Sequence, residues 1–290
     1  MLQFQKVSIG DRDRLLPLLL EKDRGCEYTF SNIYLYRNIF DTKIAYYKDS
    51  AVVNFGNSGS FLMPLGQCNL TELVAELPSE DGDTIRFVCV PKEETELLKS
   101  TFGGRIISVT AQDDPEYVYR SSDLATLSGK RYHSKRNFCT RFEKQNPGYT
   151  FEMITADNIA DVAAMNSAWY VERRGSGDDL SSDYVCSTGS LKEFNELGLT
   201  GALIRSNGRV VAWCCGEKTA EGVFCTHVEK ALGTSEGDYA IINRDFARML
   251  SAEYELINRE DDAGDEGLRK AKQSYHPLYM LEKNMVVLKK

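Results

Sequence analysis

The 290-residue sequence predicts a mixed α/β fold, of the α+β kind, in which mostly antiparallel sheets are flanked by helices. Segments with helical and with strand periodicity alternate along the whole chain. In the second half, Asn207-Gly208 joins two apolar runs, which is the strongest short signal for a β-hairpin. At roughly 150 residues per domain the length favours two domains, and we expect them to span residues 1–127 and 128–290.

Composition and charge narrow the class of protein. The chain is 42% hydrophobic and has 15 Tyr and 13 Phe, which argues against disorder. A net charge of -8 argues against wholesale electrostatic binding to nucleic acid or an anionic membrane. There is no signal-peptide pattern and no apolar run near the roughly 20 residues of a membrane span. The eight Cys lack CxxC spacing and fit buried thiols in a reducing compartment. We therefore expect a cytoplasmic protein whose lipid contacts, if any, are at its surface.

The first half predicts four helices and four strands. Helical spacing, capping residues and a proline in a first turn place the helices at residues 10–22, 31–40, 69–77 and 91–102. Apolar alternation and turn residues place two strands within residues 43–56, around a turn at residues 48–50, and further strands at 84–91 and 105–111.

The second half begins with a polar stretch, residues 120–129, and then predicts further alternating elements. We expect helices at residues 129–148, 156–175, 238–250 and 265–275. We expect strands at residues 148–154, 201–216 (the hairpin), 222–231, 254–258 and 278–288. Residues 174–190 are predicted to form a long loop.

A glycine-bearing loop connects a strand to a helix around residues 230–238. GNAT-type acyl-CoA N-acyltransferases use this order to hold the donor pyrophosphate on backbone N–H groups. Here Lys230, Gly233 and Gly237 have the wrong spacing for that fingerprint. Glu236 and Asp238 would also repel a pyrophosphate, and the alternative is that Asp238 caps the helix. The loop therefore argues against coenzyme A.

His227 and Glu229 alternate on a predicted strand and are expected to point to one face. Such a pair can act as a general base with an orienting carboxylate; the alternative is a hydrogen-bonded core histidine. Cys225 shares that face. Zinc would need a third and a fourth ligand, and no matching pair is evident, so we expect no metal.

The turn after the 254–258 strand is unusually acidic. It contains more acids than helix capping requires, which suggests a site for a cation such as an amino group or a metal; the alternative is a solvated, capped turn. Asn243-Arg244 and Asn258-Arg259 repeat one string and could converge on one polar patch. The acids are Glu260, Asp261, Asp262, Asp265 and Glu266.

The predicted helix at residues 129–148 is basic in an otherwise acidic chain. Its cations, with His133 and Asn137, are donors suited to a phosphate or carboxylate. The alternative is a solvated charged face. The candidate phosphate ligands are Lys130, His133, Lys135, Arg136 and Asn137.

Taken in order, five strings carry a resemblance: SNIYLYRN, SGKRYHSKRNFCTRF, HVEKA, GDYAIINRDFA and INREDDAGDEGLRKAKQSYHP. They resemble an uncharacterised bacterial family that is similar to the C-terminal domain of phosphatidylglycerol lysyltransferase. The resemblance covers nearly the whole chain. It implies two tandem GNAT-like acyl-CoA N-acyltransferase domains, related to Fem-type aminoacyltransferases, with aminoacyl-tRNA as donor and a lipid, peptide or small-molecule amine or hydroxyl as acceptor. The lack of a membrane segment weakens the case for phosphatidylglycerol itself.

Three functions follow as expectations. The first is an aminoacyltransferase, the second an acyl-CoA-dependent N-acetyltransferase, and the third a non-catalytic ligand-binding protein on the same scaffold. The candidate catalytic residues are His227, Glu229, Glu260 and Asp261. The candidate substrate-binding residues are Lys130, His133, Lys135, Arg136, Asn137, Lys230, Asn243, Arg244, Asn258, Arg259, Asp262, Lys270, Lys272 and Tyr275.

Overall fold

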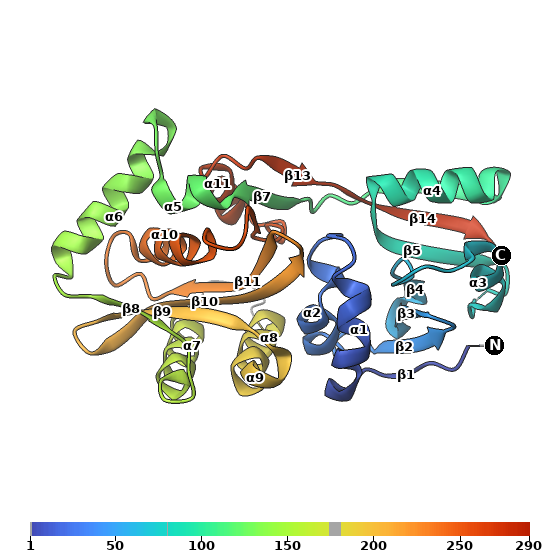
Figure 1. The fold of residues 1–290 in the computed structure, drawn as a ribbon, viewed down its shortest axis with the longest axis horizontal. Helices are drawn as coiled ribbons and strands as arrows, with labels where there is room; N and C mark the ends of the chain where they lie inside the picture. The colour runs from blue at the N-terminus through green and yellow to red at the C-terminus, as the bar shows by residue number, and fades with distance from the viewer. Residues whose placement is uncertain (1, 80, 174–180) are drawn as a thin grey trace. The chain divides into compact units, whose positions relative to one another are not determined.

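The chain folds into two compact units in a computed structural model that describes residues 2–79, 81–173 and 181–290. The first unit comprises Met1–Glu116, Asp261–Glu266 and Met280–Lys290, and the second comprises Tyr117–Glu260 and Gly267–Tyr279. Each contains a mixed sheet with helices beside it (Figure 1), as predicted for the fold class. This division differs from a single cut between residues 127 and 128, and the two-domain boundary stays a prediction.

The sheet of the first unit combines strands from both ends of the chain. Neighbouring strands are antiparallel except for β4 and β5, which are parallel. In sheet order the strands are β1 (Gln5–Lys6), β2 (Thr42–Tyr47), β3 (Ser50–Phe55), β4 (Ser60–Phe61), β5 (Thr84–Pro91), β14 (Lys283–Lys289) and β6 (Ile106–Ala111). The helices are α1 (Arg12–Leu19), α2 (Phe30–Leu35), α3 (Leu70–Glu76) and α4 (Lys92–Phe102).

Local signals account for most elements of the first unit. The Asn69 side chain accepts the N–H groups of Thr71 and Glu72 and so caps α3. Pro91 stands at the start of α4, where a missing N–H costs nothing. The predicted four helices and four strands are confirmed within a few residues at their ends, although α2 is shorter than expected.

A buried lysine joins three segments of the first unit. Lys283, at the start of β14, is fully buried. Its Nζ donates to Glu27 Oε1 at 2.5 Å and to Glu116 Oε1 at 2.7 Å. Glu116 also accepts the N–H of Cys26 at 3.0 Å. A buried charge must be paired to be tolerated, and the two carboxylates raise the pKa of Lys283 above its ordinary value against the effect of burial.

The pH dependence of folding is expected to report on Glu27. Burial raises the pKa of Glu27 to about 7, with Lys283 opposing and Glu116 adding to the shift. Because this value lies above the ordinary 4.5, the folded state holds the proton more tightly. The resulting stability is complete below about pH 4.5 and is lost as the pH rises through about 7. Urea unfolding should show a decline of at most about 1.4 kcal/mol per pH unit over that window. Glu27→Gln should remove it; a decline that persists in this variant would assign the titration to another group.

Three neighbouring strands of the second unit's sheet are longer than the others. β11 pairs in parallel with β12, whereas β10 with β11, β9 with β10, β8 with β9 and β7 with β12 pair antiparallel. In sheet order the strands are β13 (Tyr279–Leu281), β7 (Glu116–Arg120), β12 (Leu256–Asn258), β11 (Val223–Ala231), β10 (Arg209–Ala220), β9 (Thr200–Ser206) and β8 (Thr150–Met153). The helices are α5 (Ser121–Thr126), α6 (His133–Gln145), α7 (Ile159–Arg173), α8 (Ser181–Lys192), α9 (Phe194–Leu197), α10 (Asp238–Leu250) and α11 (Glu266–Gln273).

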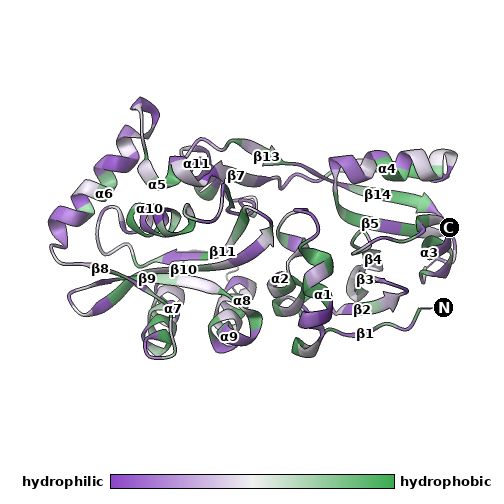
Figure 2. Ribbon diagram, in the orientation of Figure 1, coloured by the Kyte–Doolittle hydropathy of each residue, from purple (hydrophilic) through white to green (hydrophobic). Residues whose placement is uncertain are grey.

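Helices cover both faces of this sheet. α10 packs on β9, β10 and β11, and α7 packs on β10 and β11. Figure 1 shows α7 and α8 on the face opposite α10. In Figure 2 the apolar residues are concentrated on the strands and on the helix faces turned toward them. None of the described helices is long and apolar enough to cross a bilayer.

Three predictions for the second unit are wrong or incomplete. The polar stretch at 120–129 contains helix α5, and strand β7, which was not predicted, precedes it. The loop predicted for 174–190 is helix α8 from Ser181 onward, and residues 174–180 lie outside the described residues. The single closing strand is two strands, β13 and β14, in different sheets. The hairpin is confirmed: Asn207 and Gly208 both adopt the positive φ of 49° and 76° that such a two-residue turn requires.

Candidate functional site

The candidate site lies in the second unit, where β11 and β12 run parallel. Asn258 of β12 is opposite Cys225 of β11. The chain after β12 therefore brings Arg259 and Glu260 next to the stretch of β11 that carries His227 and Glu229. Two side-chain pairs form there, His227 with Glu260 and Glu229 with Arg259.

His227 occupies a β-bulge. Cys215 of β10 is opposite Val228 and Gly216 is opposite Thr226, so His227 has no partner in the register. Bulges re-aim a side chain and are common beside functional sites. The strands approach so closely here that a Cβ added to Gly216 would lie 1.8 Å from the carbonyl oxygen of Cys225. Gly216 is therefore needed for the bulge to form.

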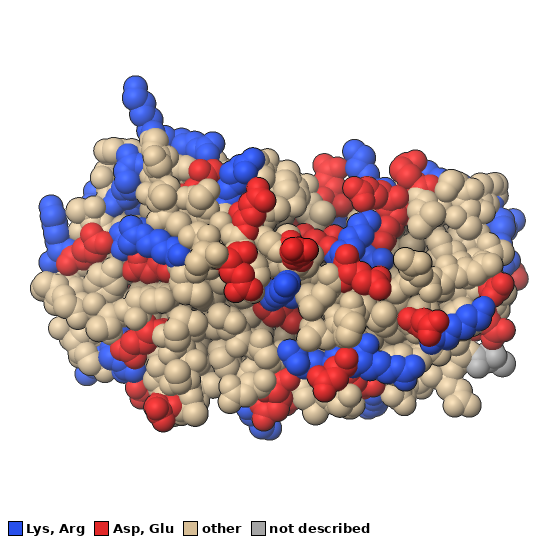
Figure 3. Space-filling model, viewed as in Figure 1, with Lys and Arg blue, Asp and Glu red and all other residues tan. Residues whose placement is uncertain are grey.

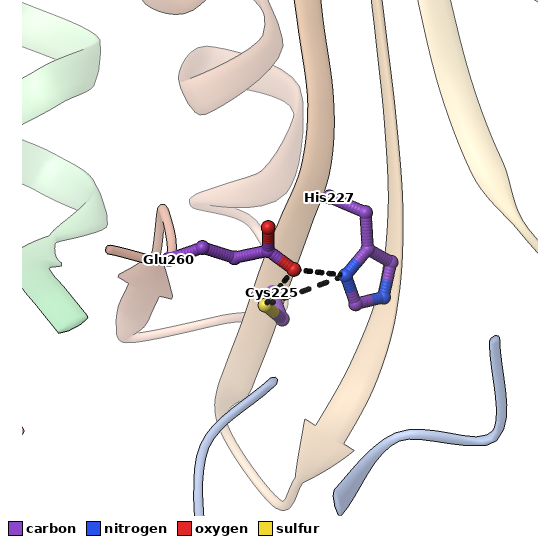
Figure 4. Close-up of side chains that lie close together, drawn as sticks. All are labelled: Cys225, His227 and Glu260. Atoms are coloured by element: carbon purple, nitrogen blue, oxygen red, sulfur yellow. Dashed lines mark hydrogen bonds and ion pairs between the residues drawn. The ribbon is translucent and has the colours of Figure 1, made fainter. Parts of the chain in front are cut away.

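Two carboxylates hold the imidazole of His227. Its Nδ1 lies 2.7 Å from Glu260 Oε1 and its Nε2 lies 3.1 Å from Glu217 Oε1. Cys225 Sγ lies 3.7 Å from Nδ1 (Figure 4). Burial opposes the charged ring, but Cys225 and the two carboxylates outweigh it and raise the pKa of His227 well above its ordinary value. The orienting carboxylates are thus Glu217 and Glu260 rather than the expected Glu229, and a protonated ring donates to both.

The second pair is centred on Glu229. Arg259 Nη2 donates to Glu229 Oε1 at 2.8 Å, and Asn243 Nδ2 donates to Glu229 Oε2 at 3.2 Å. The side chain of Arg259 is 10% exposed and that of Glu229 is 14% exposed. Arg259 Nη1 and Asn243 Oδ1 are buried and have no hydrogen-bond partner among the described residues. One carboxylate is therefore flanked by an unused donor and an unused acceptor.

Lys135 of α6 lies beside this pair. Its Nζ is 3.9 Å from the ring centroid of Tyr275, and the guanidinium of Arg259 is 4.9 Å from the same ring. Burial and the positive charge of Arg259 lower the pKa of Lys135 to about 8, although Glu229 opposes the shift. A substantial fraction of Lys135 is therefore neutral near physiological pH and can accept a proton.

Two aspartates of the acidic turn accept backbone N–H groups of the turn itself. Asp261 Oδ1 accepts the N–H of Ala263 at 2.6 Å, and Asp262 Oδ1 accepts the N–H of Gly264 at 3.1 Å. Both aspartates belong to the first unit, whereas Glu260 belongs to the second. Glu260 reaches the candidate site through its contact with His227. Its backbone adopts a positive φ of 56°. That conformation costs a non-glycine residue about 1 kcal/mol or more.

Two of the four residues predicted to converge do so. The four are Asn243, Arg244, Asn258 and Arg259. Asn243 and Arg259 meet at Glu229. Arg244 instead pairs with Asp245 and Glu143, both at 2.8 Å. The Asn258 side chain accepts the N–H of Glu260 at 2.8 Å and so shapes the turn.

The basic helix α6 has fewer available cations than its sequence suggests. Arg136 donates to the backbone carbonyls of Leu127 and Gly129. Lys130 and His133 are exposed, and Asn137 Nδ2 lies 3.3 Å from His133 Nδ1. On the face in Figure 3, blue side chains line α6 but acidic side chains are interspersed elsewhere. Phosphate binding by this helix stays a prediction.

Three further lysines belong to the predicted substrate-binding set. Lys230 pairs with Asp183 and its Nζ lies 3.8 Å from the ring centroid of Trp169. Lys272 donates to the carbonyl oxygen of Arg259 at 2.5 Å and so supports the turn. Lys270 is exposed on α11.

The loop before α10 bonds to its own aspartate. Asp238 is buried, and its Oδ2 accepts the N–H of Ser235 at 3.3 Å and the hydroxyl of Thr234 at 3.2 Å. Glu236 pairs with Arg141. A carboxylate therefore uses part of the donor set that would bind a pyrophosphate.

Two residues of the site were missed in the sequence. Glu217 lies ten residues before His227 across a hairpin, and the bulge hides their proximity from simple alternation. Tyr119 belongs to the unpredicted strand β7, and its ring centroid is 5.6 Å from the guanidinium of Arg259. The run EYVYR around Tyr119 was the available signal for that strand.

Comparison with known proteins identifies the family to which the chain belongs. A family model described as phosphatidylglycerol lysyltransferase, C-terminal, matches residues 20–287. Among curated proteins, none matches. A crystal structure of a conserved protein of unknown function from Bacteroides thetaiotaomicron is 33% identical, with a TM-score of 0.93 over 99% of this chain and 100% of that one.

Two more distant structures share the fold. The C-terminal domain of a candidate lysylphosphatidylglycerol synthetase from Agrobacterium fabrum is 14% identical, with a TM-score of 0.69 over 97% of this chain and 92% of that one. A GNAT-family acetyltransferase from Colwellia psychrerythraea is 8% identical, with a TM-score of 0.51 over 99% and 100%. The fold is therefore GNAT-like. With the family match covering residues 20–287, the chain belongs to the phosphatidylglycerol lysyltransferase C-terminal family.

Proposed function

We propose that the protein is an aminoacyltransferase that moves an aminoacyl group from aminoacyl-tRNA to an amine or hydroxyl acceptor. The observation that carries this proposal is the unused donor and acceptor around Glu229. A buried polar atom without a partner costs about 1–3 kcal/mol. Such atoms are therefore retained where a ligand supplies the missing bonds.

An aminoacyl group has the matching chemistry. Its α-ammonium group can donate to Asn243 Oδ1 and to the carboxylate of Glu229. Its carbonyl oxygen can accept from Arg259 Nη1 (buried and unpartnered among the described residues). A plain acetyl group has the carbonyl oxygen but no ammonium, so it would leave the acceptor unused. The site thus favours an aminoacyl over an acetyl donor.

The transfer step needs only one proton acceptor, because the ester is already activated. The acceptor oxygen or nitrogen attacks the carbonyl carbon, and its proton passes to neutral Lys135. Arg259 donates to the oxygen as negative charge develops there. The bond to the ribose oxygen then breaks, and Lys135 returns the proton to that oxygen. In this scheme His227 and Glu217 hold Glu260, and thereby the neighbouring Arg259, in place.

Acetyl-CoA-dependent transfer is the second candidate, because the fold resembles a GNAT-family acetyltransferase. The loop before α10 argues against the binding of coenzyme A. Asp238 already accepts from Ser235 and Thr234, and a second group of negative charges there would be repelled.

The proposal is tested with tRNA charged with radiolabelled amino acids. The 290-residue chain is incubated with the charged tRNA and either phosphatidylglycerol vesicles or small amines and alcohols. Enzyme-dependent label in the lipid or in a small product is the expected result. If label stays on the tRNA while acetyl-CoA acetylates an amine, the second candidate replaces the first. If neither donor reacts, the protein is a binding module.

Lys135 gives this assay a pH signature. Since the neutral amine is the base, the single-turnover rate should rise with pH and level off above about 8, the pKa of Lys135. Lys135→Met should lower the plateau by about 10²–10⁴-fold, the usual contribution of a general base. Lys144→Met, an exposed lysine on the same helix, is the matched control and should leave the profile intact. A pH rise that survives in Lys135→Met would show that another group accepts the proton.

A further inference from the structure

Three metal-ligating side chains converge beside the proposed transferase site. Cys225 Sγ, His227 Nδ1 and Glu260 Oε1 all lie within 4.8 Å of one another. Cys225 and His227 come from β11 and Glu260 from the turn after β12, and Figure 4 shows the three ligand atoms turned toward a common point. The sequence offered two of these ligands; the parallel pairing of β11 with β12 adds the third.

The spacing of the three atoms is close to that of a tetrahedral zinc site. Zn–S of about 2.3 Å with Zn–N and Zn–O of about 2.0 Å imply ligand atoms about 3.3–3.6 Å apart. The observed separations are 3.7 Å from Cys225 Sγ to His227 Nδ1, 4.0 Å from Sγ to Glu260 Oε1, and 2.7 Å from Nδ1 to Oε1. Shifts of about half an ångström in side chains would bring all three ligand atoms to corners of one tetrahedron.

The surroundings of His227 match those of a metal-bound histidine. Such a histidine nearly always donates its other ring N–H to a carboxylate or carbonyl, which fixes the tautomer. Here Glu217 Oε1 is 3.1 Å from Nε2, and the side chains of His227 and Glu217 are 5% and 6% exposed. With the proton on Nε2, the Nδ1 lone pair points toward Cys225 and Glu260.

The charges also balance. A Cys225 thiolate and the Glu260 carboxylate together carry two negative charges, equal and opposite to the charge of the ion. Mixed sulfur, nitrogen and oxygen ligands suit zinc better than calcium or magnesium, which take oxygen ligands. The side chain of Glu260 is 24% exposed, so solvent can reach this side of the cluster.

The other comparable cluster in the described residues lacks these properties. Cys26, Glu27 and Glu116 also bring three ligand atoms together. There the ammonium of Lys283 already lies 2.5 Å from Glu27 and 2.7 Å from Glu116. A cation is thus provided by the chain itself, and a second one would be repelled.

We propose that Cys225, His227 and Glu260 bind a zinc ion, with a solvent molecule as the fourth ligand and Glu217 as the positioning carboxylate. Binding replaces the thiol proton of Cys225 and the proton shared between His227 and Glu260, both of which pass to solvent. The ion would tie the turn that carries Arg259 and Glu260 to β11. This site goes beyond the proposed transfer reaction and does not depend on it.

In the test, the 290-residue chain is reduced and treated with a chelator. It is then titrated with Co²⁺ as a spectroscopic probe and with Zn²⁺ in competition. One equivalent of Co²⁺ should produce a thiolate-to-cobalt charge-transfer band that Zn²⁺ abolishes, with release of protons to the buffer. Cys225→Ser should remove the band. Glu217→Gln should retain it while weakening the affinity about 10–100-fold, as expected for a carboxylate outside the ligand set.

Cys26→Ser, in the cluster occupied by Lys283, and Cys139→Ser, a buried cysteine of α6, are the controls and should leave the band unchanged. Circular dichroism of each variant verifies folding. The proposal is overturned if the reduced wild-type protein shows no band at stoichiometric Co²⁺. A band that persists in Cys225→Ser, or that is lost in Cys26→Ser, would equally overturn it.

Discussion

Replacing Lys283 with methionine is expected to lower the free energy of unfolding by about 3–5 kcal/mol, the usual cost of removing one partner from a buried ionic group. The variant removes the lysine cation from Glu116, which is fully buried, and from Glu27, which is 22% exposed. Since domains are stable by only about 5–15 kcal/mol, this is a large fraction of the total. Urea titration at neutral pH measures it as a shift in midpoint.

Two further variants make the result specific. Lys289→Met changes an exposed lysine on the same strand, β14, and should alter stability by less than about 0.5 kcal/mol. Adding Glu116→Gln to Lys283→Met removes the buried carboxylate that has lost its lysine and should restore part of the loss. A Lys283→Met protein as stable as the wild type would show that this lysine does not hold the three segments together.

Replacing Arg259 with lysine is expected to lower the rate of aminoacyl transfer by about 10²–10³-fold, the range for loss of one donor to a developing oxyanion. The guanidinium has separate nitrogens for Glu229 and for a substrate carbonyl, whereas an ammonium is a single centre that cannot take both positions. Charge is conserved, so Glu229 keeps a cation. Single-turnover transfer from charged tRNA measures the effect.

Stability distinguishes this role from a structural one. Arg248→Lys, an arginine of α10 that is 53% exposed and pairs with Asp245, is the matched control and should transfer at the wild-type rate. If Arg259→Lys instead lowers the melting temperature strongly and loses activity only in proportion to unfolding, then Arg259 and its turn serve the fold. That outcome would leave the proposed role of Lys135 to be judged separately by its pH profile.

Elements with strong local signals could be predicted from the sequence. The Asn207-Gly208 hairpin, the capped helix α3 and the amphipathic helix α10 each depend on contacts between residues close in the chain. Helix α8 could not be predicted, because Ser181–Lys192 is rich in residues of modest helix propensity. Its position depends on tertiary bonds, such as Asn166 Nδ2 to Ser187 Oγ at 3.2 Å. Strand β7 was missed because all but the last of its residues are buried, so it shows no alternation.

For the site, the sequence alone pointed to the right segments: the HVEK strand, the acidic turn after INRED and the basic helix. These are short strings whose residue types carry chemistry wherever they fold. Only the tertiary structure decided which partners meet. The parallel register of β11 and β12 places Glu260 beside His227 and Arg259 beside Glu229. The bulge in β11 places Glu217 beside His227. Register and bulges arise from packing between distant segments, and no local pattern of residues encodes them.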